Sequence, residues 1–406
     1  MLCQFSFKNF RSYKNQTVFD LQSTLIPEFR ESLLESENDS SKRFLPVSVL
    51  YGPNGGGKSN VLFALSYLIL LVARPIKELR KNKTEFIFIP DYEIEAAPFL
   101  LDDISKNVPT DFEIFFRTMK NEYRYILSTF KEEVVEEYLF RRAVGGKKTA
   151  TIFERHGSTV NLGASINKST VNTAVNPKMP YLPFLAINYN FDVITEVQEW
   201  FESCVIQTHF APDSKKRVLS EANDNFKIKL LGLLNDMGIN IEDYRFDDLD
   251  HRFYVKRKVD GKFYELDFSF ESDGTKKLFD VLPTILISLL EGRLAIIDEL
   301  DVKLHPKLLR YIIMLFKNPD VNKYGAQLLF TSHDLATMKN DVFRRDEIWF
   351  AAKIDDESSE IYSLYEIRKE DNTRIKSTAA YDKQYFEGRY GADPYLANML
   401  TWEVKR

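Results

Sequence analysis

The chain has 406 residues, of which 44% are hydrophobic, and a formal net charge of −5. This composition can bury a large core, excludes a chain dominated by disorder, and gives no overall sign of nucleic-acid binding, although a local basic face could still bind DNA. Two widely separated cysteines, Cys3 and Cys204, argue against a disulfide framework or a cysteine-based zinc site and indicate a reducing, cytoplasmic setting. The longest apolar stretch, from Phe63 to Ala73, is too short to cross a bilayer, so we expect no contact with a membrane.

The first elements predict one half of a nucleotide-binding core over residues 1–109. Alternating apolar residues at 2–8 and 17–21 predict an opening hairpin. A buried-strand pattern over 44–52 ends at a glycine, and helical periodicity follows over 59–73. A strand, a glycine-rich turn and a helix in this order are what a phosphate-binding loop requires.

Two different patterns interrupt this core. Short alternating runs over 110–160 predict an antiparallel β subdomain, and helical spacing over 161–245 predicts a helical lobe. Residues 246–406 return to an α/β alternation, after a hairpin that turns at Asp260-Gly261, and complete the core. We therefore expect an α/β P-loop fold whose split core is interrupted by the β meander and the helical lobe.

The strongest motif is the run from Gly52 to Ser59, which fits the pattern G-x-x-x-x-G-K-[ST]. Glycines allow backbone amides to point at phosphate groups, Lys58 can reach the β- and γ-phosphates, and the Ser59 hydroxyl can ligate Mg²⁺. The positive end of the following helix adds to this attraction. The residues that we expect to bind ATP are Asn54, Gly55, Gly57, Lys58, Ser59 and Asn60.

A second motif, LAIIDELD over 294–301, is a buried strand that ends in carboxylates. Asp298 stands where it can join Ser59 in holding Mg²⁺, and Glu299 stands where a base can polarise the attacking water. Asp301 begins the following turn. Together with the upstream loop, these residues predict a Mg²⁺-dependent ATPase.

A third strand, in the run LLFTSHD over 328–334, ends near His333. Because the carboxyl ends of parallel strands face the ligand, we expect His333 to contact the γ-phosphate. His305, in the turn after the acidic strand, is the rival, and we interpret it as a residue that caps or packs there.

A fourth run, FESDGTKK over 270–277, precedes a predicted helix. Ser272 and Gly274 offer a hydroxyl and open backbone amides, which suit either a helix cap or a second anion site. The position of this run shortly before LAIIDELD favours the anion site.

In this order the motifs resemble those of the ABC-type ATPase heads of SMC, RecF and OLD-like proteins, and NFRSY over 9–13 is similar to the opening of that group. The resemblance implies that FESDGTKK is a signature motif, that Asp301 belongs to the D-loop and that His333 is the His switch. It also implies a head-to-head homodimer with two ATP molecules, each held between the phosphate loop of one subunit and Ser272 and Gly274 of the other.

The chain departs from that group at two places. Asp273 stands where the signature usually has a glycine. A Q-loop glutamine is not evident, and although Asp102 or Asp103 in the run PFLLDD could lie near the metal, we favour a surface loop there.

The whole chain also resembles the stand-alone AAA15-type ATPases of abortive phage-resistance systems, the RloA/AbiLi group, with YFEGRYGADPYL over 385–396 as the similar tail. This narrower resemblance implies a sensor or scaffold ATPase, a dimer or higher oligomer, that controls a separate effector protein encoded by a neighbouring gene.

Other classes of function are open to the same motifs. A DNA-repair or DNA-maintenance ATPase that clamps duplex DNA could use the basic runs at 77–83, 141–148, 214–218 and 252–262. A nuclease would need a metal domain after His333, where the acidic cluster Asp355 to Glu357 is better explained as a hairpin tip, so we expect no intrinsic nuclease activity. A ring-forming AAA+ ATPase fits less well, because the insertion precedes the acidic strand and a histidine follows it.

Overall fold

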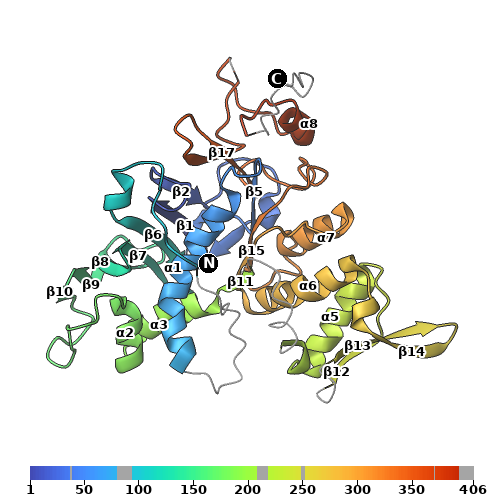
Figure 1. Cartoon of the computed structure of the whole chain (residues 1–406), viewed down its shortest axis with the longest axis horizontal. Helices are drawn as coiled ribbons and strands as arrows, with labels where there is room; N and C mark the ends of the chain where they lie inside the picture. Colours follow the sequence, from blue (N-terminus) through green and yellow to red (C-terminus); the bar gives the residue numbers. More distant parts are fainter. Residues whose placement is uncertain (37–38, 80–93, 208–217, 248–251, 370, 393–406) are drawn as a thin grey trace, which may run out of the picture.

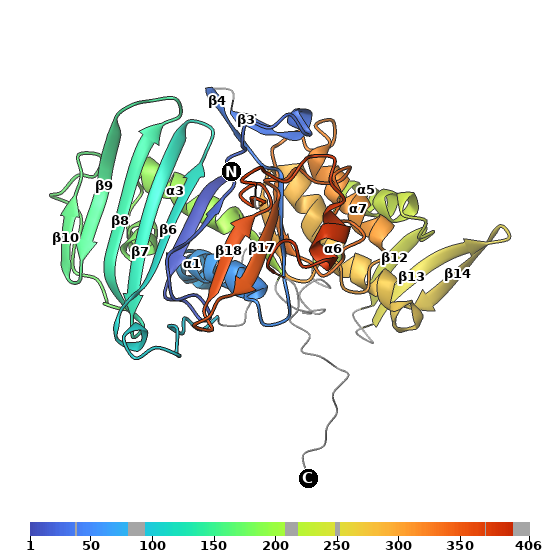
Figure 2. The ribbon, with the colours of Figure 1, turned by 90° about the horizontal axis from the view of Figure 1, so that it is seen from above.

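The computed structural model describes residues 1–36, 39–79, 94–207, 218–247, 252–369 and 371–392. Two large β-sheets lie side by side, with helices packed between and around them, and a small third sheet projects at one end (Figure 1, Figure 2).

The first sheet is antiparallel and has the strand order β10-β9-β8-β7-β6-β1-β2. The expected opening hairpin is confirmed by the pairing of Phe5 with Phe19, and the expected meander is confirmed by β6 to β10. The meander is not a separate unit, however, because β1 pairs with β6 and joins the hairpin to it. The strands are β1 (Leu2–Lys8), β2 (Thr17–Asp20), β6 (Thr110–Arg117), β7 (Asn121–Phe130), β8 (Glu133–Ala143), β9 (Thr149–His156) and β10 (Thr159–Leu162).

The second sheet carries the nucleotide motifs and has the order β11-β15-β16-β5-β17-β18. Every neighbouring pair is parallel except the hairpin of β17 and β18. The carboxyl ends of β5, β15 and β16 therefore lie at one edge, where the motifs meet. The strands are β5 (Val47–Tyr51), β11 (Val205–Gln207), β15 (Leu294–Ile297), β16 (Gln327–Thr331), β17 (Ile348–Lys353) and β18 (Ser359–Ser363).

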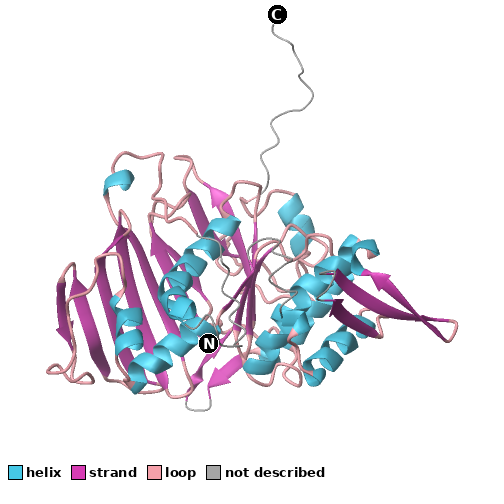
Figure 3. Cartoon of the chain, turned by 60° about the horizontal axis from the view of Figure 1, so that its bottom comes forward, coloured by secondary structure: helices cyan, strands magenta, loops and turns pink. Residues whose placement is uncertain are grey.

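Helices cover both faces of this parallel sheet (Figure 3). Alternate strand residues point to two separate cores: Leu50, Ile296 and Leu329 join the first, and Val49, Ile297 and Phe330 join the second. The first core contains α1 (Lys58–Leu79), α2 (Tyr181–Asn188) and α3 (Asp192–Ser203), and the second contains α5 (Asp224–Asp236), α6 (Asp273–Glu291), α7 (Pro306–Lys317) and α8 (Tyr381–Phe386).

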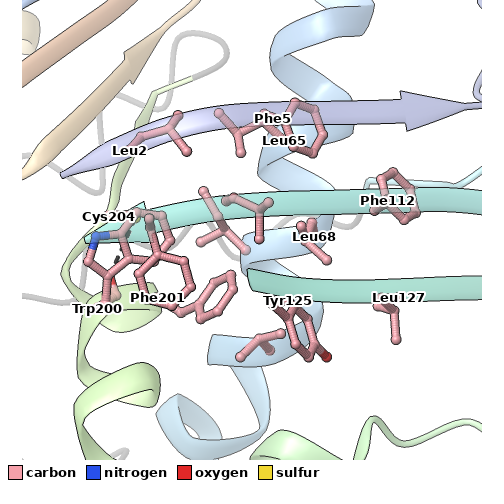
Figure 4. Close-up of a cluster of buried hydrophobic side chains, with 14 of the residues drawn as sticks. Leu2, Phe5, Leu65, Leu68, Phe112, Tyr125, Leu127, Trp200, Phe201 and Cys204 are labelled. Carbon is pink, nitrogen blue, oxygen red and sulfur yellow. Dashed lines mark hydrogen bonds between the residues drawn. The ribbon is translucent and has the colours of Figure 1, made fainter. Parts of the chain in front are cut away.

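The first core fills the space between the antiparallel sheet and α1 (Figure 4). Leu65 and Leu68 of α1 are fully buried there, and the ring of Trp200 stacks on Phe116 with 4.1 Å between centroids. By length and composition α1 could span a membrane, but most of it is buried inside the protein, so it is explained as a core helix. Cys204 is buried and free at one end of this core.

The stretch expected to form one helical lobe, 161–245, is instead divided between the two cores. Helices α2 and α3 pack against α1, whereas α5 packs against α6. The buried carboxylate of Glu137 fixes the start of α2, because it accepts hydrogen bonds from the backbone N–H groups of Tyr181 and Leu182 at 2.5 and 2.9 Å. Helical spacing predicts a helix, but it does not say which core the apolar face joins.

Smaller elements complete the fold. The expected turn at Asp260-Gly261 is confirmed, and both residues have positive φ, as a two-residue hairpin turn requires. The remaining strands are β3 (Leu34–Ser36), β4 (Asp39–Phe44), β12 (Asp243–Asp247), β13 (Arg252–Val259) and β14 (Lys262–Asp267), and the 3₁₀ helices are η1 (Arg30–Ser32), η2 (Ser105–Asn107) and η3 (Phe268–Phe270).

A buried ion pair joins the end of α7 to the start of β17. Lys317 Nζ donates to Glu347 Oε2 at 2.6 Å, and the two side chains are 1% and 0% exposed. Burial lowers the pKa of Lys317 and raises the pKa of Glu347, while each charge opposes the shift of its partner. Because the Glu347 carbonyl accepts from Val49 N at 2.9 Å, this pair also supports the strand that leads into the glycine-rich loop.

Replacing Glu347 by alanine should lower the free energy of unfolding by about 3–5 kcal/mol, because it leaves the Lys317 ammonium buried without its opposite charge. Urea denaturation followed by circular dichroism measures this. The control is Glu357→Ala, which removes an exposed ion pair with Lys353 and should cost about 1 kcal/mol at most. Equal losses in the two variants would contradict the role given to the buried pair.

Candidate functional site

The glycine-rich loop follows β5 and leads into α1, in the order expected. Gly52 has a φ of 146°, and a Cβ atom there would lie 2.1 Å from the Ala351 carbonyl oxygen of β17. Gly57 has a φ of 105°, and a Cβ atom there would lie 2.6 Å from Ser359 Oγ and 2.9 Å from the Tyr13 hydroxyl. These contacts require glycine at both positions.

The NFRSY segment supports the loop from behind. The Tyr13 hydroxyl donates to the Gly57 carbonyl at 3.2 Å, and Asn60 Nδ2 donates to Ser12 Oγ at 2.9 Å. Ser359 N donates to the Ser12 carbonyl at 2.7 Å, which ties the β17–β18 hairpin to the same segment. Burial raises the pKa of Tyr13 far above its usual value, so its hydroxyl stays protonated and can donate.

Lys58 is folded over its own loop. Its Nζ donates to the carbonyls of Gly52 and Pro53 at 2.9 and 3.0 Å, and the side chain is mostly buried. Burial lowers the pKa of Lys58, and the carboxylates of Asp298, Glu299 and Asp301 raise it in opposition. The loop cation and the acidic strand end therefore face one another.

Asp298 is the most tightly held carboxylate of the site. Its Oδ1 accepts from Ser59 Oγ at 3.0 Å and from Thr331 Oγ1 at 2.5 Å. Its Oδ2 is buried and has no hydrogen-bond partner among the described residues. An oxygen pair made of a serine hydroxyl and an unsatisfied carboxylate suits Mg²⁺, which takes one or two protein oxygens together with phosphate oxygens and water. The residues present therefore fit the metal that the motif implies.

Glu299 adopts an unusual backbone conformation. Its φ is 50°, in the left-handed region that non-glycine residues seldom occupy, and its side chain is exposed. The Glu299 N–H donates to Thr331 Oγ1 at 2.7 Å, so one hydroxyl orients both Asp298 and Glu299. Sequence reasoning missed Thr331, although a hydroxyl at the last position of the strand before Ser332 and His333 was a visible signal.

His333 and Asp301 are brought together at the same edge. The backbone N–H of His333 donates to Asp301 Oδ2 at 3.0 Å. Partial burial and the nearby Lys58 charge lower the pKa of His333, so its ring is neutral at pH 7. The rival His305 caps α7 instead, since its Nδ1 accepts from Lys307 N at 3.2 Å, as expected.

The expectation of a surface loop at Asp102 is confirmed. Its carboxylate accepts from the hydroxyl of Ser105 at 2.7 Å and pairs with Lys14 at 3.7 Å. The acidic cluster Asp355 to Glu357 lies at the tip of the β17–β18 hairpin, also as expected.

Ser272 and Gly274 lie at the exposed start of α6. Ser272 is the N-cap, and its Oγ accepts from Thr275 N at 3.1 Å. Asp273 forms an ion pair with Lys303 at 3.1 Å, which connects this helix end to the turn after the acidic strand. The hydrogen bonds of Ser272 stay within α6, whereas those of Ser59, Asp298, Thr331 and Glu299 form one connected group.

Gln207 is a second residue that the sequence analysis missed. Its run, 205–207, lies in the stretch predicted to be helical but forms β11, next to the acidic strand. The Gln207 carbonyl accepts from Asp298 N at 2.9 Å, and its side-chain amide donates to Asp280 Oδ2 of α6 at 2.6 Å. A short apolar run that ends in a polar residue was the available signal for this strand.

This site and this fold define an α/β protein with a P-loop ATPase fold. The chain belongs to the family described as "AAA domain, putative AbiEii toxin, Type IV TA system", whose model matches residues 47–339. The α/β P-loop fold with its antiparallel sheet, expected from the sequence, is thereby confirmed. No match was found among curated proteins.

Three solved structures are similar to this chain, and each similarity extends over 89% of it. One is the Smc head bound to the C-winged helix domain of ScpA, with 12% identity, 97% of that chain covered and a TM-score of 0.43. Another is the Smc head domain with an extended coiled coil bound to the C-terminal domain of ScpA derived from Pyrococcus furiosus, with 11% identity, 96% covered and a TM-score of 0.37. The third is the recombination mediator protein RecF, with 12% identity, 98% covered and a TM-score of 0.29.

Replacing Thr331 by valine keeps the side-chain shape but removes the hydroxyl that orients Asp298 and Glu299. We expect kcat for ATP hydrolysis to fall about 10- to 100-fold, since small misplacements of catalytic groups have effects of this size. ATP binding, measured by calorimetry, should change far less. Thr331→Ser, which keeps the hydroxyl, should restore most of the rate; an equally slow serine variant would contradict the role given to this hydroxyl.

Proposed function

We propose that this chain hydrolyses Mg²⁺-bound ATP at composite sites in a homodimer and uses the ATP-bound state to control a separate effector protein in a bacterial anti-phage system. The observation that carries the ATPase proposal is the Asp298 carboxylate, which is held by Ser59 and Thr331 and keeps its buried Oδ2 for a ligand.

The proposed roles follow from these positions. Lys58 and the loop amides of Asn54, Gly55 and Gly57 hold the phosphates, together with Ser59 and Asn60. Ser59 and Asp298 would hold Mg²⁺, which would supply positive charge opposite the phosphate oxygens. Glu299 accepts a proton from the attacking water, and the neutral ring of His333 donates a hydrogen bond to the γ-phosphate. Asp301 accepts from the backbone N–H of His333 and so holds the turn after β15 against the turn after β16.

The solvent exposure of the site residues in the single chain supports the proposal that hydrolysis depends on a dimer. Glu299 and His333 are exposed in the single chain, where water weakens every electrostatic interaction with the phosphates. Ser272 and Asp273, at the start of α6, are exposed too, and a helix N-terminus is a ready site for an anion. In the proposed head-to-head dimer these two exposed surfaces cover each other around ATP.

Replacing Glu299 by glutamine should lower kcat by about 10²- to 10⁴-fold, because the proton acceptor is lost while the phosphate contacts remain. The variant should still bind ATP and should accumulate as an ATP-bound dimer, which light scattering after size-exclusion chromatography detects. Lys58→Ala should give neither ATP binding nor this dimer.

The matched control for Glu299 is Glu357→Gln, because Glu357 is also an exposed glutamate with positive φ but lies at the tip of the β17–β18 hairpin. It should hydrolyse ATP at the wild-type rate. Wild-type turnover by Glu299→Gln would remove Glu299 as the base.

Ser272→Arg should block the shared site while leaving ATP binding by the same subunit intact. Neither Ser272→Arg nor Lys58→Ala should hydrolyse ATP alone, but a mixture should. In a mixed dimer the intact loop of one subunit meets the intact Ser272 of the other, so one of the two sites is whole. Ser169→Arg, at an exposed serine elsewhere, is the control. A mixture that stays inactive would contradict the composite site.

The role in phage defence is supported by the family description, which names a toxin of a toxin–antitoxin system, and by the resemblance to abortive phage-resistance ATPases. The tail over 385–396 carries part of this resemblance, and its residues after 392 lie outside the described part of the chain. Co-purification of this chain with the product of the neighbouring gene, in the presence of ATP and without DNA, tests the proposal.

The basic runs give limited support to a duplex-DNA clamp. Within 252–262, Arg252 and Arg257 pair with acidic side chains of the same subunit, as does Arg142 in the run 141–148. The runs 77–83 and 214–218 lie largely outside the described residues. Lys256 and Lys258, which lie over the exposed ring of Phe263, are the best candidates for nucleic-acid contact. A salt-dependent shift of duplex DNA in a gel would favour this alternative over the effector proposal.

A further inference from the structure

Lys277 lies on the inner face of α6, five residues after Ser272, and is 4% exposed. A lysine is seldom buried this deeply unless its ammonium is paired. Its Nζ donates to the backbone carbonyl oxygen of Glu299 at 3.3 Å. Burial lowers the pKa of Lys277, and the neighbouring carboxylates Asp280, Asp301, Glu299 and Asp298 act in the opposite direction.

The same face of α6 contacts the catalytic edge a second time. Asp280, one turn after Lys277, accepts a hydrogen bond from Gln207, and Thr284, one further turn along, donates to Gln207 Oε1 at 3.0 Å. The Gln207 carbonyl in turn accepts from the backbone N–H of Asp298. The helix that Ser272 caps is therefore tied to the residues on either side of the Asp298–Glu299 peptide bond.

These contacts matter because the backbone of Glu299 needs support. A glutamate at φ 50° is held in a strained conformation that non-glycine residues seldom adopt and that persists where its surroundings fix it. The N–H of Glu299 donates to Thr331, and its carbonyl accepts from Lys277 and, within the turn that follows, from the Val302 N–H at 3.3 Å. Of these supports, Thr331 belongs to the sheet and Lys277 belongs to α6.

We propose that Lys277 is a positioning residue that makes Glu299 of one subunit sensitive to the ATP bound by the other. This inference depends on the proposed function, in which Ser272 and Gly274 meet the nucleotide of the partner subunit. A shift of α6 on meeting that nucleotide moves Lys277 and, through the carbonyl bond, the backbone of Glu299. Each site then reaches full activity when the other is filled, and hydrolysis is cooperative in ATP.

The experiment measures hydrolysis against ATP concentration for the wild-type protein, Lys277→Met and Lys277→Arg. The wild type should give a Hill coefficient clearly above 1. Lys277→Met, which keeps the chain length and removes the donor, should lower kcat about 10- to 100-fold, change KM less than about 3-fold and bring the Hill coefficient to about 1. Lys277→Arg should recover both cooperativity and most of the rate. Lys307→Met, at an exposed lysine of the neighbouring helix α7, should behave as wild type.

The outcomes separate this inference from the ATPase proposal beneath it. If the wild type hydrolyses ATP and Glu299→Gln does not, the proposed function stands, and a Lys277→Met variant with the wild-type kcat and Hill coefficient overturns the coupling. A wild-type Hill coefficient of 1 overturns it as well. If Lys277→Met fails to fold, as judged by thermal unfolding, Lys277→Arg is the deciding variant. A folded arginine variant that keeps a donor but has lost cooperativity and rate overturns the proposal that this hydrogen bond couples the two sites.

Discussion

The carboxylate of Asp298 joins parts of the chain that lie far apart in sequence. Its Oδ1 accepts from Ser59 at the start of α1 and from Thr331 at the end of β16, while Asp298 itself follows β15. A buried carboxylate left without these donors would cost roughly 1–3 kcal/mol or more. The strand order β15-β16-β5 supplies both donors, so the arrangement of the sheet and the chemistry of the site depend on the same contacts.

The residues of the site around the Asp298 carboxylate differ in how far they are exposed to solvent. Asp298 and Lys58 are buried, whereas Glu299 and His333 are exposed. In the proposed function, the groups that bind phosphate and metal are organised inside one subunit, whereas the groups that act on the γ-phosphate face water. The proposed dimer would cover these groups with the start of α6, where the positive end of the helix dipole lies.

Local patterns in the sequence were sufficient to predict the parts of the fold that depend on neighbouring residues. The glycine-rich loop, the acidic strand end and the hairpin at Asp260-Gly261 each need particular residue types at adjacent positions. Contacts between distant segments were not predictable in this way. The helices expected over 161–245 are present, but their division between the two cores was not predictable, since an amphipathic helix has the same periodicity in either core. Gln207 and Lys277 were missed because their roles depend on hydrogen bonds to residues that are distant in sequence. A glutamine in an apolar run and a lysine on a helix do not by themselves indicate such contacts.

The wall behind the glycine-rich loop has a consequence for the making of the protein. Tyr13 and Ser359 both contact Gly57, and Ala351 closes on Gly52, so this wall combines the beginning of the chain with a hairpin near its end. During synthesis the loop emerges from the ribosome long before β17 and β18 do. A truncated product that ends before residue 348 lacks Ala351 and Ser359, so the contacts that close around Gly52 and Gly57 can form only after the β17–β18 hairpin has been made.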